Sequence, residues 1–149
     1  MPHDGHVEWQ VCYEPGQLLA KAYMNGNTVA TDLVQTTGAP ARIELTTDRT
    51  TLNADDEDTV VAAVSILDEK GRLVPDADRR VTFQLTGGGR ILGVGNGNPA
   101  DHDPDRAEQR NSFHGHCIAV IQAGSQPASL HLVATSPGLA SGSLSFDVR

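Results

Sequence analysis

The chain has 149 residues and a formal net charge of −8; glycine and proline are frequent, and aromatic residues make up only 4%. An acidic chain repels phosphate backbones and anionic lipid, so nucleic acid and membrane surfaces are not expected as partners. The length suits one ordinary domain together with a piece of another. No apolar run reaches the length of a membrane span. Met1–His6 lacks the basic region and apolar stretch that predict a signal peptide.

The first part of the chain has the pattern of a β-hairpin. The turn sequence Asn25-Gly26-Asn27 separates two strand-like runs, Leu18–Met24 and Thr28–Thr36. Asn-Gly favours a positive φ at both central turn positions, which is typical of a tight hairpin. We expect about three strands in this part, too few to close a two-sheet sandwich. Residues 1–38 are therefore predicted to be the C-terminal strands of a truncated β-sandwich domain.

Residues 39–149 are predicted to form a second domain, because Thr37–Ala41 is short, polar and contains Gly and Pro. Apolar and polar residues alternate in Val81–Leu85 and Gly142–Val148, as in strands with one buried face. Val60–Leu67 is apolar on both faces and is expected to be a central strand. Turn residues separate these runs at Asp68–Gly71, Gly87–Gly89 and Ser136–Gly138. About seven strands with this spacing predict an all-β, immunoglobulin-like β-sandwich.

The two cysteines, Cys12 and Cys117, each lie in an apolar-rich run that resembles a strand. This setting favours two separate buried thiols. A disulfide that joins the two regions remains the alternative, although no spacing pattern supports it.

Several motifs resemble one enzyme family. Trp9–Ala20 reads W-x-V-x-Y-x-P-G-x-L-x-A and is followed by Tyr23–Gly26. The pair resembles a segment in the C-terminal region of many glycoside hydrolase family 2 β-galactosidases, where it ends a small sandwich domain. Later segments are similar to the junction that follows and to parts of the family's last immunoglobulin-like domain: Thr36–Pro40, Leu45–Arg49, Asn53–Asp55, Val64–Ala77, Gly89–Pro99 and Ser136–Leu139.

The resemblance implies a bacterial parent enzyme that hydrolyses β-galactosides, in the periplasm or outside the cell. Family 2 enzymes use two carboxylates on a (β/α)8 barrel, and their acid follows an Asn in an Asn-Glu pair. The chain contains no Asn-Glu dipeptide, and it lacks the length and the strand–helix alternation of a barrel. We therefore expect no catalytic residue, no cofactor and no metal in it.

One loop concentrates oxygen ligands of the kind that calcium binds. Its spacing is not that of an EF-hand, and Asp and Asn are also common turn residues. A structural loop is therefore favoured over a metal or sugar contact, within an exposed stretch Asn98–Asn111. The candidate contact residues are Asn96, Asn98, Asp101, Asp103 and Asp105.

Two further groups are candidate sites. Trp9, Tyr13 and Tyr23 could stack on sugar rings, but a lone Trp in a small β-domain more often lies in a core or an interface. The cluster His114-Gly115-His116-Cys117 resembles a metal site. In a strand, however, its two histidines would project to one side and the cysteine to the other.

Four functions are consistent with these patterns. The first is an accessory module that packs against the other domains of the parent glycosidase. The second is a carbohydrate-binding module, and the third is an adhesin-like immunoglobulin repeat, because strings like Val-Pro-Asp-Ala before Val-Thr-Phe also occur in adhesins. The fourth is an independent enzyme, which the missing barrel disfavours. Self-association is expected wherever a sheet edge is left unpaired.

Overall fold

A computed structural model of the chain describes residues 6–149. Residues 1–5, which carry most of the signal-peptide argument, lie outside this range. The described residues form eleven strands and no helix, which confirms the all-β prediction. This part of the chain accordingly offers no helix long and apolar enough to span a membrane. The chain divides into two compact units, Met1–Thr36 and Thr37–Arg149.

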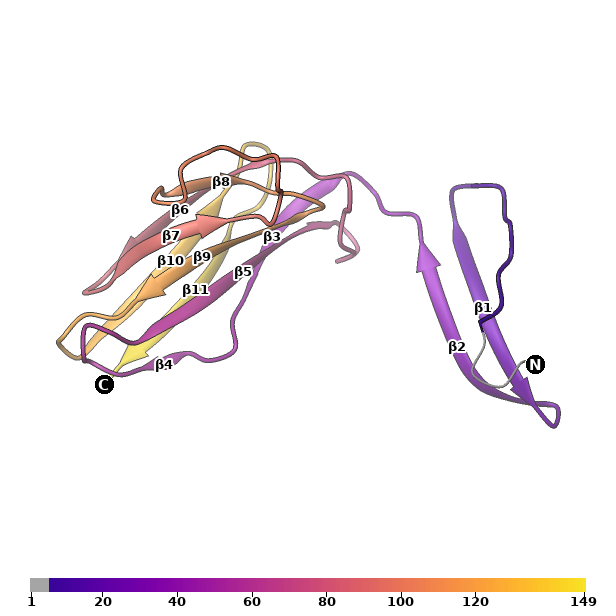
Figure 1. Ribbon diagram of the computed structural model, residues 1–149, viewed down its shortest axis with the longest axis horizontal. Coiled ribbons are helices and arrows are strands. Elements are labelled where there is room, and N and C mark those ends of the chain that lie inside the picture. Colours follow the sequence, from indigo (N-terminus) through magenta and orange to yellow (C-terminus); the bar gives the residue numbers. More distant parts are fainter. Residues whose placement is uncertain (1–5) are drawn as a thin grey trace. The chain divides into compact units, whose positions relative to one another are not determined.

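The first unit is a single antiparallel hairpin (Figure 1) of β1 (Gln17–Met24) and β2 (Asn27–Gln35). Asn25 and Gly26 have φ angles of 50° and 81°, the positive pair that the Asn-Gly sequence predicts. The expected third strand is absent among residues 6–16. A segment becomes a strand only where a neighbour satisfies its backbone groups, and the described residues offer none to this segment.

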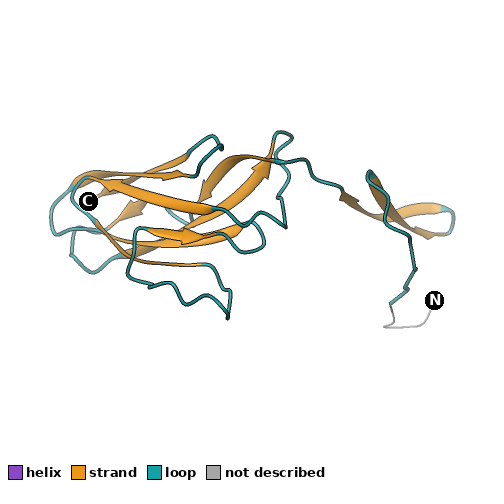
Figure 2. Ribbon diagram, turned by 90° about the horizontal axis from the view of Figure 1, so that it is seen from above, coloured by secondary structure: helices purple, strands orange, loops and turns teal. Residues whose placement is uncertain are grey.

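The second unit is a sandwich of two sheets, and its strands lie in two layers (Figure 2). One sheet has four strands in the order β3-β5-β9-β7, and the other has five in the order β4-β11-β10-β6-β8. Seven of these strands are long, as predicted, and β4 and β8 are short additions. The bounds are β3 Pro40–Thr46, β4 Thr51–Leu52, β5 Thr59–Asp68, β6 Arg80–Thr86, β7 Arg90–Gly95, β8 Gln109–Asn111, β9 His116–Gln122, β10 Ala128–Thr135 and β11 Gly142–Val148.

The core lies between the two sheets and follows the period of two. Strand β5 is internal to its sheet, as its apolar sequence predicts. Its residues Val60, Ala62, Val64 and Ile66 are buried, whereas Val61 between them is exposed. In a strand, alternate side chains face opposite sides, so β5 contributes one face to the core and places Val61 on the outer face of its sheet.

The prediction of two buried thiols is half right. Cys117 on β9 is buried, and burial raises the pKa of its thiol to about 12. Cys12 is exposed and lies outside any strand, so the expectation for this residue was wrong. Both cysteines are free. The apolar run around Cys12 has no sheet partner in the described chain, so its apolar side chains are not covered.

Candidate functional site

The acidic loop between β7 and β8 is closed by an arginine. Arg110 on β8 is 2% exposed. It forms ion pairs with Asp101 at 3.1 Å and Asp105 at 2.5 Å. Its guanidinium also donates to the carbonyl oxygens of Val94 at 3.0 Å and Asp103 at 3.1 Å. The prediction that Asn98–Asn111 is an exposed loop was therefore wrong at its end: Gln109–Asn111 is strand β8, and Arg110 within it is buried.

The other candidate residues of this loop are also engaged. The Asn96 side chain donates to the Asp101 carboxylate at 2.6 Å, and the Asn98 side chain accepts the N–H of Ala100 at 3.0 Å. Asp103 pairs with Arg80 on β6. The backbone N–H of Asp103, with Arg110 and Asn96, holds the pKa of the Asp101 carboxyl below its usual value. The loop oxygens thus surround a guanidinium, which favours a structural loop over a cation site.

Sequence reasoning missed Arg110, although two signals were present. The loop carries several aspartates in a short span, and a cation close to such a cluster offsets the repulsion between them. Arg110 and Ser112 are two residues apart, so they face the same side of the chain, and both side chains are buried. A period of two with a charged residue on the buried side is a pattern that a search for apolar alternation does not detect.

The three candidate aromatic residues are all exposed in the hairpin unit. Trp9 is 72%, Tyr13 79% and Tyr23 58% exposed. Among the described residues, no ring pair joins any two of them. The three rings thus form no contact with one another, and Trp9 lies in no core within residues 6–149. Sugar stacking and an interface position for Trp9 stay predictions.

The His-Gly-His-Cys segment is a tight turn followed by a strand, which corrects the expectation of a continuous strand. His114 and Gly115 have φ angles of 51° and 79°. His114 Nδ1 lies 3.3 Å from the carbonyl oxygen of Pro75, and His116 Nδ1 lies 3.2 Å from that of Val64. No group of three or more metal-ligating side chains occurs in the described part of the chain.

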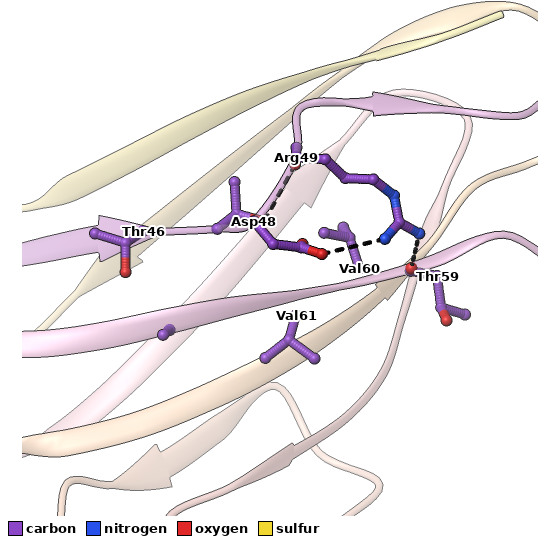
Figure 3. A pocket seen from close by; sticks show the side chains of 8 residues that line it. Thr46, Asp48, Arg49, Thr59, Val60 and Val61 are labelled. Carbon is purple, nitrogen blue, oxygen red and sulfur yellow. Dashed lines mark hydrogen bonds and ion pairs between the residues drawn. The ribbon is translucent and has the colours of Figure 1, made fainter.

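A shallow depression that the sequence did not predict opens beside β3 and β5 (Figure 3). Its volume is about 360 Å³. Arg49 lies at its rim and donates to Asp58 Oδ1 at 2.7 Å and to the carbonyl oxygen of Thr59 at 2.6 Å. The lining combines apolar side chains with hydroxyl and charged groups: Thr46, Thr47, Asp48, Arg49, Thr59, Val60, Val61 and Ala63.

A buried carboxylate anchors the start of the second unit. Asp68, at the end of β5, accepts the N–H of Gly38 at 2.8 Å and pairs with Arg72 at 2.6 Å. It also accepts the backbone N–H groups of Lys70 and Arg72. The Gly38 hydrogen bond and the Arg72 side chain hold the pKa of this carboxyl well below its usual range. Asp68 thereby fixes the segment that precedes β3 onto the sandwich.

Comparison with known proteins gives consistent results. The family described as glycoside hydrolase family 2 C-terminal domain 5 matches residues 43–145. A second family, described only as a domain of unknown function, matches residues 1–30. A β-galactosidase of Bacteroides ovatus is 46% identical over 134 residues, which are 90% of this chain and 16% of that enzyme.

Solved structures show the same relationship. A glycosyl hydrolase family 2 member from Bacteroides cellulosilyticus superposes with a TM-score of 0.91 at 29% identity, over 95% of this chain and 18% of that one. A β-glycosidase from Bacteroides vulgatus gives 0.86 at 29% identity, over 94% and 18%. The chain thus spans less than a fifth of these relatives. The matches confirm the resemblance drawn from the motifs.

Proposed function

Because the chain belongs to the glycoside hydrolase family 2 C-terminal domain 5 family, we propose that it is a non-catalytic accessory module of a β-galactosidase-like enzyme. The observation that carries the proposal is the family match over residues 43–145, together with the 16% share of the Bacteroides ovatus β-galactosidase. By resemblance, the catalytic barrel lies in the remaining polypeptide. The module's role is to pack against the other domains and stabilise them.

Three carboxylates of the sandwich have the character of structural anchors, which is consistent with an accessory role. A glycosidase general acid needs a raised pKa so that it stays protonated near neutral pH. The resolved shifts of Asp58, Asp68 and Asp101 are all in the opposite direction. Backbone N–H groups and an arginine stabilise each of these carboxylates in the ionised form, which suits a structural anchor.

The hairpin unit supports a continuation of the fold into other parts of the enzyme. Leu18 pairs with Val34 on one face of the hairpin, and Leu19 pairs with Leu33 on the other. All four side chains are exposed, and an isolated two-stranded hairpin is only marginally stable in water. We therefore assign residues 1–38 to the end of a sandwich domain that other strands of the enzyme complete, and residues 39–149 to the last domain.

A carbohydrate-binding role is the second candidate, because Trp9 and Tyr13 expose most of their surface. Both lie in the hairpin unit, however, and under the proposed assignment other strands of the enzyme cover that unit. Affinity electrophoresis against galactans, arabinogalactans and xyloglucan separates the two functions. The accessory role predicts no retardation by any of them, whereas retardation that Trp9→Ala abolishes would establish a binding module.

The accessory role is tested by deleting residues 37–149 from the glycosidase that carries them. We expect kcat/KM for a nitrophenyl β-galactoside at low temperature to stay within about twofold, because no catalytic group is removed. The half-life at elevated temperature should fall, because stabilising contacts are lost. A folded deletion variant that loses about tenfold or more in kcat/KM would contradict the proposal.

A further inference from the structure

The two outer faces of the sandwich differ sharply in character. On the five-stranded sheet, the outward positions of β6, β10 and β11 pair as Thr82–Thr135, Gln84–Val133, Thr86–His131, Ser143–Val133, Ser145–His131 and Asp147–Ser129. Only Val133 is apolar in this set. Hydroxyl, amide and charged groups of this kind are typical of a face that stays in water.

The outward face of the four-stranded sheet has an apolar centre. Ala63 on β5 pairs with Ile118 on β9, and Val61 pairs with Val120. We call these four residues the apolar patch. Val61 is 45% and Ile118 37% exposed. β-branched residues favour strands in general, but the outward positions of β6, β10 and β11 carry only one, Val133, apart from threonines. The contiguous group on β5 and β9 is therefore the informative feature.

Other surfaces adjoin the patch on both sides. Strand β7, beside β9, places Gly93 and Gly95 opposite Val120 and Ile118. The backbone of Asp105 lies close to the outward side of Gly93, and Leu92 in the β7 bulge is 39% exposed. On the other side, Val61 and Ala63 continue into the depression of Figure 3. An apolar surface next to a hollow can receive an apolar side chain from a second surface.

The chemistry of this face indicates a protein surface as its occupant. No Trp, Tyr or Phe stands at the outward positions of β3, β5, β7 and β9. Sugar binding on a sheet face depends on such rings, because sugars stack on aromatic faces. Aliphatic side chains without charge form the centre, and the polar pairs Thr59–Gln122 and Ser65–His116 bound it along β5 and β9. This arrangement matches the anatomy of a protein interface.

The size of the patch distinguishes between protein partners. Four side chains are far fewer than the 20 or so residues per side that a stable interface between separate molecules uses. A tethered domain needs much less, because the linker holds it at an effective concentration of about millimolar. The chain occupies 18% of the solved Bacteroides cellulosilyticus chain, so in that relative a large body of other domains is joined to the equivalent module.

We propose that the apolar patch docks against another domain of the same glycosidase polypeptide, with one apolar side chain of that domain seated in the adjoining depression. This inference rests on the proposed accessory role and adds the face through which the contact is made. The Ser- and Thr-rich face of the other sheet stays in water.

Thiol labelling of the complete glycosidase and of the isolated chain tests the assignment. Ile118→Cys places a reporter in the patch, and Ser143→Cys places a matched reporter on the polar face; Val61→Cys is a second patch variant. Modification at each position is read by mass spectrometry of its peptide. Cys117 does not interfere, because it is buried.

We expect Ile118→Cys to react about tenfold or more slowly in the complete enzyme than in the isolated chain, since only locally open molecules react. Ser143→Cys should react equally fast in both. Equal rates at Ile118→Cys in the two proteins, or equal protection of both reporters, would overturn the proposal. Protection of Ile118→Cys in the isolated chain that rises with concentration would assign the patch to a second copy instead. Hydrolysis by the isolated chain would refute the proposed function, and it would leave these labelling rates unchanged.

Discussion

Replacing Arg110 by Met tests whether this arginine holds the acidic loop on the sandwich. Methionine keeps most of the apolar stem but removes every donor of the guanidinium. The carbonyl oxygens of Val94 and Asp103 lose their charged donor, and Asp101, whose side chain is 13% exposed, loses its partner. Breaking a buried ion pair by removing one member costs about 3–5 kcal/mol.

The expected cost lies at the lower end of that range. Asp105 is 88% exposed, so water replaces its lost partner at little cost. We therefore expect Arg110→Met to lower the free energy of unfolding by about 3 kcal/mol. Arg80→Met is the matched control, because Arg80 pairs with Asp103 from a side chain that is 39% exposed. That exposed pair should be worth less than about 1 kcal/mol.

Urea unfolding followed by far-UV circular dichroism measures both variants. Tryptophan fluorescence is unsuitable, because Trp9, the only tryptophan, belongs to the hairpin unit and does not report on the sandwich. The reasoning is refuted if the two variants lose equal stability, or if Arg110→Met costs less than about 1 kcal/mol.

Three further predictions concern the sandwich and the thiols. Gly115→Ala should lower the free energy of unfolding in urea by about 3 kcal/mol, because φ is positive and a Cβ would lie 2.6 Å from the backbone oxygen of Val74. Gly97→Ala is the control: φ is positive there too, but the space around the glycine is open, so the loss should be about 1 kcal/mol. At about pH 8, a disulfide reagent should modify only Cys12 in the native chain and both thiols in urea, because Cys117 is buried with a pKa raised to about 12. Asp68 has a lowered pKa in the folded state against 3.8 for the free group, so its stabilisation is present at neutral pH and decreases as pH falls below about 5. The stability gap between the natural chain and Asp68→Asn should therefore narrow on acidification; a constant gap from neutral to acidic pH would show that ionisation of Asp68 does not stabilise the fold.

The sequence predicted those parts of the fold that local rules decide. The Asn25-Gly26 turn has the positive φ angles that its residues favour, and β5 is a central strand because its apolar run leaves few polar side chains to face water. The Gly-rich segment 87–89 and the Ser136–Gly138 turn also separate strands as expected. In each case the deciding information lies within a few neighbouring residues.

The errors came from information that is not local. Arg110 is buried because Asp101 and Asp105, distant by several residues, supply its charge partners. The third strand of the first unit did not form, because a strand depends on a neighbour and not on its own sequence alone. The turn at His114 and Gly115 is the exception, because it is local: Phe113 and His116 bond to each other across it. The strand pattern around Cys117 conceals this turn.

The outer faces were the least predictable feature. The apolar runs of β5 and β9 predict buried strands, but they do not show which face meets the core or what the other face meets. The contrast between the apolar patch and the Ser- and Thr-rich face became visible only when the register placed Val61 beside Val120 and Ala63 beside Ile118.

The most direct test of the central claim is an assay of the purified chain itself against a panel of nitrophenyl glycosides that includes the β-galactoside. A non-catalytic module predicts no turnover above the uncatalysed rate in fractions where the chain elutes as a single species. Turnover that co-elutes with the chain, and that survives repeated purification, would contradict the account and place a catalytic site within these 149 residues.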